Sequence, residues 1–403
     1  MLHQAKSLSL HLKSFLETCQ SLRLFSTKSK PTRRYPRKDG DDDHEERERN
    51  RKEKYGEAGT IHLNKSRGQH ILTNPRVLDA IVRKAEIKPT DTVLEIGPGT
   101  GNLTLRLLEA AEKVIAVEID NRMIKILNTR VFEHRFQDRI TVSFKVLQVI
   151  CKDALKAEFP KFDLIVANIP YGISSPLIAK LVFGDRPFRN ATLLLQKEFA
   201  RRLLANPGES EYNRLAVNVK LVADVEFIMD VSKRDFVPCP RVDSSVVKIR
   251  PKAQVPDVDM HEWWAFTRTC FSKKNKTIGA TFKQKKKLVE LGKRTQAMTE
   301  SKDNVPSDSY DNDDGEEDDE DEEEGGVEGE CSSSSLEVEA TLFKEKVIGV
   351  LEAGGFGEKR PSKMSNEELL HLLSLFNQAG IHFHDHDKRK EKYNVPFDAS
   401  LIT

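Results

Sequence analysis

Cysteine is scarce in this sequence of 403 residues, and its five cysteines are scattered: Cys19, Cys151, Cys239, Cys270 and Cys331. No CxxC pair occurs, which argues against a disulfide framework or a zinc module and fits a reducing compartment. Long apolar runs are also lacking. None approaches the ~20 residues that a membrane helix needs, so the sequence excludes an integral membrane protein.

A large net charge of one sign is lacking as well, but the net charge of +1 hides an uneven distribution. Residues 311–330 contain 14 acidic residues and no Lys or Arg. The 65 Lys and Arg therefore face 50 acidic residues elsewhere, and the other 383 residues carry +15. A basic body suits a polyanionic partner such as nucleic acid, although a generally solvated surface would give the same charge.

The N-terminal region divides into two segments of different composition. Residues 1–38 contain nine Lys or Arg and one acidic residue, Glu17, with recurring Ser and Leu. This composition predicts an organelle transit peptide and favours the mitochondrion over the alternative, a basic arm directing the protein to the nucleolus. Residues 39–58 are highly charged and almost free of apolar side chains, which predicts a disordered linker.

From residue 59 to residue 251, short β-branched runs alternate with helical periodicity. The expected strands are Thr92–Ile96, Val114–Ile119, Leu147–Cys151, Asp163–Ala167, Ala191–Leu195, Val225–Asp230 and Ser245–Ile249. Alternating strands and helices predict an α/β fold, a doubly wound, Rossmann-like domain with a parallel sheet and helices on both faces.

After Pro251 the strand pattern stops and a smaller helical domain is expected over residues 252–395. Residues 302–335 are rich in Asp, Glu, Gly and Ser and cannot bury a core, so they predict a disordered acidic insert within that domain. Helical spacing returns over residues 337–380.

A glycine-rich motif, Gly97-Pro98-Gly99-Thr100-Gly101, follows the first expected strand and precedes a helix. Glycine lets a nucleotide-like ligand approach the backbone closely, and the helix start offers free N–H groups. Glu118 ends the next strand, 21 residues after Gly97, where a carboxylate can accept hydrogen bonds from both ribose hydroxyls. Because Asn102 stands where a dinucleotide fingerprint has glycine, the pattern favours a nucleoside cofactor without a diphosphate, such as S-adenosylmethionine.

A second motif, Asn168-Ile169-Pro170-Tyr171, follows another buried strand and should face the same crevice. The amine of adenine is a poor nucleophile because its lone pair is delocalised into the ring. The Asn168 side-chain oxygen and a backbone carbonyl could accept its two N–H bonds and aim the lone pair at a methyl group. Tyr171 offers a face on which a flipped base can stack.

These motifs resemble those of the KsgA-type ribosomal RNA adenine N6,N6-dimethyltransferases over about residues 65–290. The similar segments are, in order, KSRGQHIL (Lys65–Leu72), EIGPGTGNLT, VEID, KDAL, NIPY, FVPCPRVDS (Phe236–Ser244) and FSKKNKTI (Phe271–Ile278). LFNQAGIHF (Leu375–Phe383) resembles the C-terminal end of eukaryotic members. The resemblance implies a class I methyltransferase domain that uses S-adenosylmethionine and dimethylates two adjacent adenines of the 3′-terminal small-subunit rRNA hairpin.

The resemblance also implies roles for individual residues. The cofactor would contact His70, Leu72, the loop of Gly97, Gly99 and Gly101, Glu118, Asp153 and Asn168. Asn168 would hold the target amine, and Tyr171 and Phe236 would sandwich the target base. The sequence departs from the family pattern at Lys152, where glycine is usual, and in the long segment 119–152, which contains apparently duplicated strand-like sequence.

The stretch Ser272–Lys287 contains seven lysines and no acid. Beside a base-methylation site, we interpret it as a contact with RNA, so the expected partner is small-subunit rRNA or the pre-ribosomal small subunit. A solvated helix face is the alternative. Nothing in the sequence requires more than a monomer, and no membrane partner is expected.

Two further features are interpreted as non-catalytic. The histidines of the stretch from His382 to His386 alternate without distant ligands, so we assign no metal. Cys239 lies at a spacer position of its motif without a placed His partner, and we interpret it as a packing thiol.

Two rival functions stay open at this point. A non-catalytic nucleic-acid binder of the same family, similar to mitochondrial transcription factors, would keep the fold without the activity. A dehydrogenase would use the same glycine loop but would give the NIPY segment no purpose.

Overall fold

The computed structural model describes residues 70–137, 146–300 and 334–384. Three predicted segments therefore lie wholly or mainly outside the described residues: the transit peptide or basic arm 1–38, the linker 39–58, and residues 302–333 of the acidic insert. Residues 385–395 of the expected helical domain lie outside them as well.

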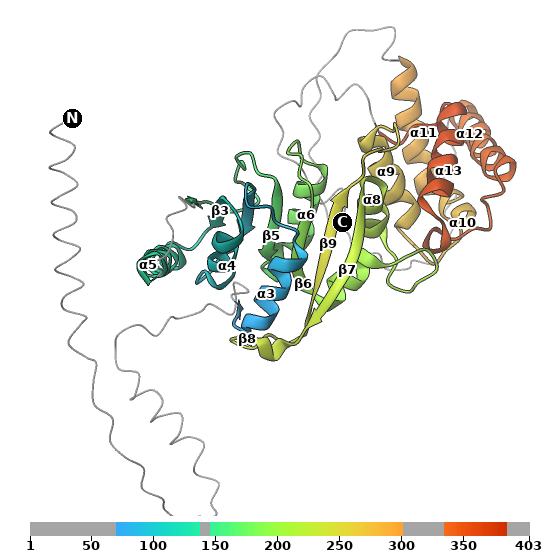
Figure 1. The fold of residues 1–403 in the computed structure, drawn as a ribbon. Helices are drawn as coiled ribbons and strands as arrows, with labels where there is room; N and C mark the ends of the chain where they lie inside the picture. The colour runs from blue at the N-terminus through green and yellow to red at the C-terminus, as the bar shows by residue number, and fades with distance from the viewer. Residues whose placement is uncertain (1–69, 138–145, 301–333, 385–403) are drawn as a thin grey trace, which may run out of the picture. The chain divides into compact units, whose positions relative to one another are not determined.

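The described chain is built around a sheet of seven strands in the order β4-β3-β2-β5-β6-β9-β7 (Figure 1). The strands are β2 (Thr92–Ile96), β3 (Lys113–Glu118), β4 (Val146–Cys151), β5 (Leu164–Asn168), β6 (Ala191–Gln196), β7 (Ala223–Val231) and β9 (Ser244–Pro251). Each contains most or all of one strand expected from the sequence, so the mixed α/β architecture is confirmed. A second sheet pairs β1 (Ile71–Leu72) with β8 (Phe236–Val237).

The direction of β9 corrects the expected parallel sheet. β9 pairs antiparallel with both β6 and β7, whereas the pairings among β2, β3, β4, β5 and β6 are parallel. The reason lies in the connection from β7. It contains the short 3₁₀ turn η3 (Lys233–Asp235) and β8 but no crossover helix, so the chain turns back on itself.

Two layers of helices cover the sheet. One face packs against α3 (Pro75–Lys84), α4 (Asn102–Ala110) and α5 (Asn121–Gln137), and the other against α6 (Ser174–Phe183), α7 (Lys197–Leu204) and α8 (Arg214–Val222). Neighbouring strand residues divide between the two cores: Val93 lies in the first and Leu94 in the second. Burial on both faces explains why these strands read as continuous apolar runs in the sequence.

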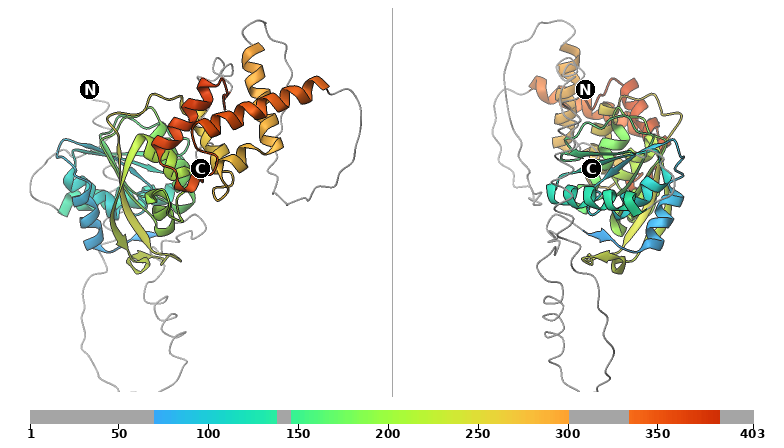
Figure 2. Two further views of the ribbon diagram at one scale, coloured as in Figure 1. Left: turned by 90° about the vertical axis from the view of Figure 1, so that its right-hand side faces the viewer. Right: turned by 60° about the vertical axis from the view of Figure 1, so that its left-hand side comes forward.

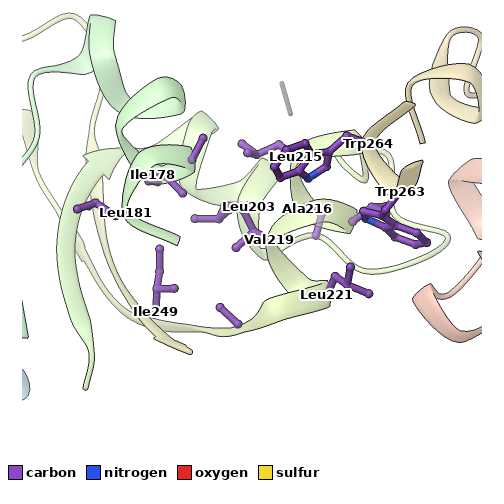
Figure 3. Packing of buried hydrophobic residues seen from close by; sticks show 14 of the residues in the cluster. Ile178, Leu181, Leu203, Leu215, Ala216, Val219, Leu221, Ile249, Trp263 and Trp264 are labelled. Carbon is purple, nitrogen blue, oxygen red and sulfur yellow. The ribbon is translucent and has the colours of Figure 1, made fainter. Parts of the chain in front are cut away.

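The C-terminal helices extend the core of the α6–α8 face. They are α9 (Met260–Phe271), α10 (Ile278–Phe282), α11 (Lys285–Glu300), α12 (Ser334–Ala353) and α13 (Asn366–Gln378). Trp263 and Trp264 of α9 lie beside Leu215 and Ala216 of α8 in one buried cluster (Figure 3). The Tyr212 hydroxyl also donates to the Met364 carbonyl over 3.1 Å. The helical region therefore shares a hydrophobic core with the sheet region.

Local sequence signals fix the outer helices. Ser365 and Glu368 form a capping box in which each side chain accepts the other's backbone N–H, and this starts α13. Helices α11 and α12 cross each other (Figure 2, left), with Gly292 facing Phe343. In the described part of the chain, no helix combines the length and apolarity that crossing a membrane requires.

Gly101 provides a stability test of the packing between α4 and α5. Its φ is +86°, and a Cβ there would lie 2.5 Å from Leu127 Cδ1. Gly208 has a similar φ of +94° but nothing within 4 Å of a Cβ. We expect Gly208→Ala to lower the free energy of unfolding by about 1–2 kcal/mol from backbone strain. Gly101→Ala should cost about 1–3 kcal/mol more because Leu127 must move. Denaturant unfolding of both variants measures the difference, and equal costs would contradict the packing argument.

Candidate active site

A cavity opens at the carboxyl ends of β2, β3 and β5, the edge where open α/β sheets bind ligands. We call it the edge cavity. Its walls come from β1, the β2–α4 loop, the β3–α5 turn and the segment after β5. The lining includes seven residues expected from the sequence, namely His70, Leu72, Gly97, Gly99, Glu118, Asn168 and Tyr171. Leu78, Glu95, Ile119 and Met123 also line it and were not expected.

The glycine loop of the edge cavity has a backbone that side chains would disturb. Gly97, Gly99 and Gly101 all have positive φ, at +67°, +54° and +86°. A Cβ on Gly97 would lie 3.4 Å from the Pro170 ring, so it would narrow the passage between the loop and the segment after β5. The loop therefore leaves room for a ligand to lie directly on the backbone.

Glu118 ties the glycine loop to the next turn. Its carboxylate accepts the Gly99 N–H at 3.2 Å through Oε2, and the Ile119 and Asp120 N–H groups at 2.9 Å through Oε1. Burial raises the pKa of Glu118, and these three hydrogen bonds limit the rise. The carboxylate thus shapes two walls of the edge cavity in addition to any contact with a ligand.

Glu95 is a site residue that the sequence reading missed because it stands inside an apolar strand run. It is 1% exposed, and its Oε2 has no hydrogen-bond partner within the described residues. Burial raises the pKa of Glu95 to about 8, and the negative charge of Glu118 acts in the same direction. An orphaned carboxyl oxygen in the cavity wall fits a ligand that carries a cationic or hydrogen-bond donor group.

Glu95 should make the stability of the ligand-free protein depend on pH. The pKa of Glu95 is raised above the unfolded value of 4.5. Its contribution to the free energy of unfolding is therefore complete below pH 4.5 and is lost as the pH rises through about 8. Between pH 4.5 and pH 8, we expect the free energy of unfolding of the wild type to fall by about 1 kcal/mol per pH unit relative to that of Glu95→Gln. Denaturant unfolding at pH 5, 7 and 9 measures this. Parallel pH profiles for the two proteins would contradict the assignment.

Asn168 ends β5 with its amide held in one orientation. Its Nδ2 donates to the backbone carbonyl of His70 over 3.1 Å. Within the described chain no donor satisfies its Oδ1, and the residue lines the edge cavity. Because the NH₂ group is fixed by His70, the free oxygen is presented as an acceptor to a ligand.

Tyr171 is held by two neighbours. Its hydroxyl is 2.7 Å from Ser244 Oγ, and its ring stacks on that of His70 with centroids 5.9 Å apart. Burial raises the pKa of the Tyr171 hydroxyl, so the group is neutral at physiological pH. Ser244 is fully buried at the start of β9, so the tyrosine is anchored to the sheet.

The β1–β8 pair, which we call the clasp, joins the N-terminal wall of the edge cavity to the segment before β9. Leu72 pairs with Phe236, and His70 Nδ1 lies 2.8 Å from the Pro238 carbonyl oxygen. The Leu72 carbonyl in turn accepts Asn102 Nδ2 over 2.8 Å. Through the clasp, the start of α4 is therefore connected to β8, which lies far along the chain.

Three predicted site residues do not line the edge cavity, namely Gly101, which faces Leu127 of α5, Phe236 and Asp153. Phe236 is part of the clasp, is 2% exposed, and packs its side chain into the hydrophobic core. Asp153 lies two residues after β4, where its Oδ1 accepts the Leu155 N–H at 2.9 Å. Within the long segment 119–152, residues 146–151 form β4 in register with β3. This register places Asp153 beyond the strand's carboxyl end, next to the strand that carries Glu118.

The structure corrects the interpretation of Cys239 and places the histidine stretch. Cys239 is exposed on the β8–β9 loop, because this short connection runs over the surface, so it is not a packing thiol. His384 stacks on His261 with centroids 5.1 Å apart. Among residues 70–137, 146–300 and 334–384, no group of three or more His, Cys, Asp or Glu side chains is arranged to hold a metal. Asp385 and His386 lie outside these ranges.

Comparison with known proteins places this chain in a family. The sequence profile described as "Ribosomal RNA adenine dimethylase" matches residues 61–312. A protein of Arabidopsis thaliana, "Ribosomal RNA small subunit methyltransferase, mitochondrial", is 56% identical over 85% of this chain and 88% of its own length. A second Arabidopsis protein, "Ribosomal RNA small subunit methyltransferase", is 50% identical over 81% of this chain and 93% of its own length.

A solved structure agrees with these sequence matches. The crystal structure of a dimethyladenosine transferase from Plasmodium falciparum superposes with a TM-score of 0.64 at 39% identity, covering 78% of this chain and 100% of that chain. The resemblance noted from the motifs is thereby confirmed. The chain belongs to the ribosomal RNA adenine dimethylase family.

Proposed function

We propose that this protein transfers two methyl groups from S-adenosylmethionine to N6 of each of two adjacent adenines in the 3′-terminal hairpin of small-subunit rRNA. The observation that supports this most directly is Asn168, which lines the edge cavity and whose amide NH₂ donates to the His70 carbonyl, so that its oxygen is left as the acceptor for a ligand. The proposed role is a step in small-subunit biogenesis, with the pre-ribosomal small subunit as partner and the protein acting as a monomer.

The edge cavity fits S-adenosylmethionine in three respects. The glycine loop has the open backbone that a ligand can lie on, Glu118 ends β3 where a ribose would bind, and Glu95 offers an unsatisfied oxygen for a cationic group. His70 and Leu72 would close the cavity from β1, and Asp153 would bind the adenine amine of the cofactor from the end of β4. When bound, S-adenosylmethionine supplies an electrophilic methyl group on a sulfonium sulfur.

The protein's contribution to the transfer would be orientation of the target amine. Asn168 Oδ1 and a neighbouring backbone carbonyl would accept both N–H bonds of the adenine amine, which frees the nitrogen lone pair from the ring. Tyr171, anchored by Ser244, would stack on the flipped base. No strong base is required, because the nitrogen loses its proton readily after methylation. Stacking by Phe236 on the other face of the base requires its ring, now 2% exposed, to leave the core.

RNA affinity would come from the basic stretch Ser272–Lys287, which the structure places from the end of α9 to the first turn of α11. Lysines neutralise phosphates without reading sequence, so selection of the hairpin would rest on its shape and unstacked bases.

The test is a methylation assay with the full chain, labelled S-adenosylmethionine and a transcript of the rRNA hairpin, read by primer extension. Stops at two adjacent adenines are expected, together with donor binding by isothermal titration. Donor binding without transfer would favour the alternative, a non-catalytic nucleic-acid binder of the same family. Nicotinamide binding in place of both would favour a dehydrogenase.

We also propose that the protein acts in the mitochondrion, with the nucleolus as the alternative. The composition of residues 1–38 supports this, as does the mitochondrial name of the Arabidopsis relative. Microscopy of a fluorescent fusion carrying residues 1–40 tests it, and nucleolar fluorescence would contradict the mitochondrial assignment.

A further inference from the structure

Residues 153–157 form a turn just beyond the carboxyl end of β4, and we call it the β4 turn. The Asp153 carbonyl oxygen accepts the N–H groups of Lys156 and Ala157, at 3.0 and 2.8 Å. The Asp153 carboxylate accepts the Leu155 N–H at 2.9 Å through Oδ1, and among the described residues nothing donates to its Oδ2. The turn therefore holds Asp153 by one carboxylate oxygen and leaves the other as an acceptor for a ligand.

The ammonium group of Lys180, on α6, holds the far end of the β4 turn. Its Nζ donates to the carbonyl oxygens of Ala154, Leu155 and Ala157, at 2.9, 2.8 and 2.6 Å. An ammonium group has three N–H donors, so these carbonyls use all of them. Within the described parts of the chain, these are the only hydrogen bonds that join the β4 turn to another element.

The surroundings of Lys180 fix its ammonium group in this position. Nζ lies 4.6 Å from the centre of the Phe159 ring, and Phe159 is buried. Burial lowers the pKa of Lys180, whereas the negative charges of Asp153 and Glu158 raise it. The ammonium group is thus enclosed by carbonyl oxygens and an aromatic face, and it differs from a solvated surface lysine.

The contacts of Lys180 determine where the carboxylate of Asp153 lies. The side chains of Ala154 and Ala157 pack in the core of the α6–α8 face, but they are short and nonpolar and do not fix the turn's orientation by themselves. Three hydrogen bonds from one helix fix both its position and its orientation. A shift of about 1 Å in a positioning contact can cost much of its effect. Loss of the ammonium group should therefore displace the carboxylate.

We propose that Lys180 is a positioning residue that makes the site selective for a methyl donor carrying an adenine amine. It holds the β4 turn so that Asp153 Oδ2 accepts an N–H of that amine. This rests on the proposed function, in which Asp153 binds the adenine amine of the donor. A displaced carboxylate loses this one contact and leaves those of the glycine loop and Glu118 in place.

The test measures equilibrium binding of two ligands to the full-length protein. One is S-adenosylhomocysteine, the product left by the donor, and the other is its analogue with hydrogen in place of the adenine amine. The wild type should prefer the ligand with the amine by about 30-fold, the effect expected of a hydrogen bond to a charged acceptor. Lys180→Met should lower this preference below about 3-fold and leave affinity for the analogue within about 2-fold of the wild type. Asp153→Ala should lose the preference equally, and adding Lys180→Met to it should cause no further loss.

Lys156→Met is the matched control. Lys156 lies in the same turn with an exposed side chain, so its variant should keep the wild-type preference. If Lys180→Met does not fold, Lys180→Gln replaces it. Because glutamine keeps an NH₂ group but no charge, this variant should lower the preference at least about 3-fold.

Equal weakening of both ligands by the Lys180 variant, with the preference intact, would overturn the proposal, because a general loss of stability acts on both ligands alike. A wild type that binds both ligands equally well would also overturn it, and would leave the proposed methyl transfer unaffected. Failure of the wild type to bind S-adenosylhomocysteine at all would contradict the proposed function, and the role of Lys180 with it.

Discussion

Replacing Asn168 by alanine should reduce methyl transfer by at least about 1,000-fold, because the variant loses the acceptor that we propose orients the adenine amine. The side chain contributes one hydrogen bond to the fold, from Nδ2 to the His70 carbonyl, and its loss should cost about 1 kcal/mol. Donor affinity should therefore fall by less than about 10-fold. Single-turnover methylation and isothermal titration separate the two quantities.

Asn168→Asp is the informative companion to the alanine variant. It keeps a side-chain acceptor at the edge cavity but loses the donor to His70, so its activity should lie between those of the wild type and Asn168→Ala. Full dimethylation by the alanine variant would defeat the proposed orientation of the amine. Equal losses in both variants would indicate that the contact with His70, rather than the free oxygen, is what matters.

Replacing Glu118 by alanine should lower donor affinity by at least about 100-fold, equivalent to about 3 kcal/mol. Three backbone N–H groups, of Gly99, Ile119 and Asp120, lose their charged acceptor, so two walls of the edge cavity loosen together. Any contact of the carboxylate with the donor's ribose is lost as well. Isothermal titration of S-adenosylmethionine measures the effect.

Glu118→Gln should give an intermediate loss of affinity. An amide oxygen can replace Oε1 and keep the bonds from Ile119 and Asp120, but the NH₂ group would then face the Gly99 N–H. Glu133→Ala, on the exposed side of α5, is the matched control and should leave donor affinity unchanged. An alanine variant at position 118 that binds the donor normally would show that the glycine loop holds its shape unaided.

The strands, and the positions of the main motif residues at their ends, are predictable from the sequence because both depend on local patterns. Buried strands of a doubly wound sheet read as short β-branched runs, and all seven were located this way. Gly97 follows one such run and Asn168 ends another. Because ligands bind at the carboxyl ends of the strands in such a sheet, the sequence predicts that both residues line one site, and both line the edge cavity.

The features that the sequence did not reveal depend on contacts between distant residues. The reversal of β9 follows from a connection without a crossover helix, which a strand pattern does not record. Glu95 stands inside an apolar run, and the sequence marks neither its burial nor its unsatisfied oxygen, which depend on the surrounding fold. The burial of Phe236 arises from its pairing with Leu72 across the clasp, and no local signal marks that pairing.

The clasp also bears on how the protein is made. His70 and Pro238 are 168 positions apart, so the first is synthesised well before the second. At ribosomal speeds of about 5–20 residues per second, this interval lasts roughly 8–34 s. Throughout it, the nascent chain has the glycine loop but lacks the segment that fastens β1 over it. The growing polypeptide therefore cannot complete the walls of its edge cavity until most of the sheet has been translated.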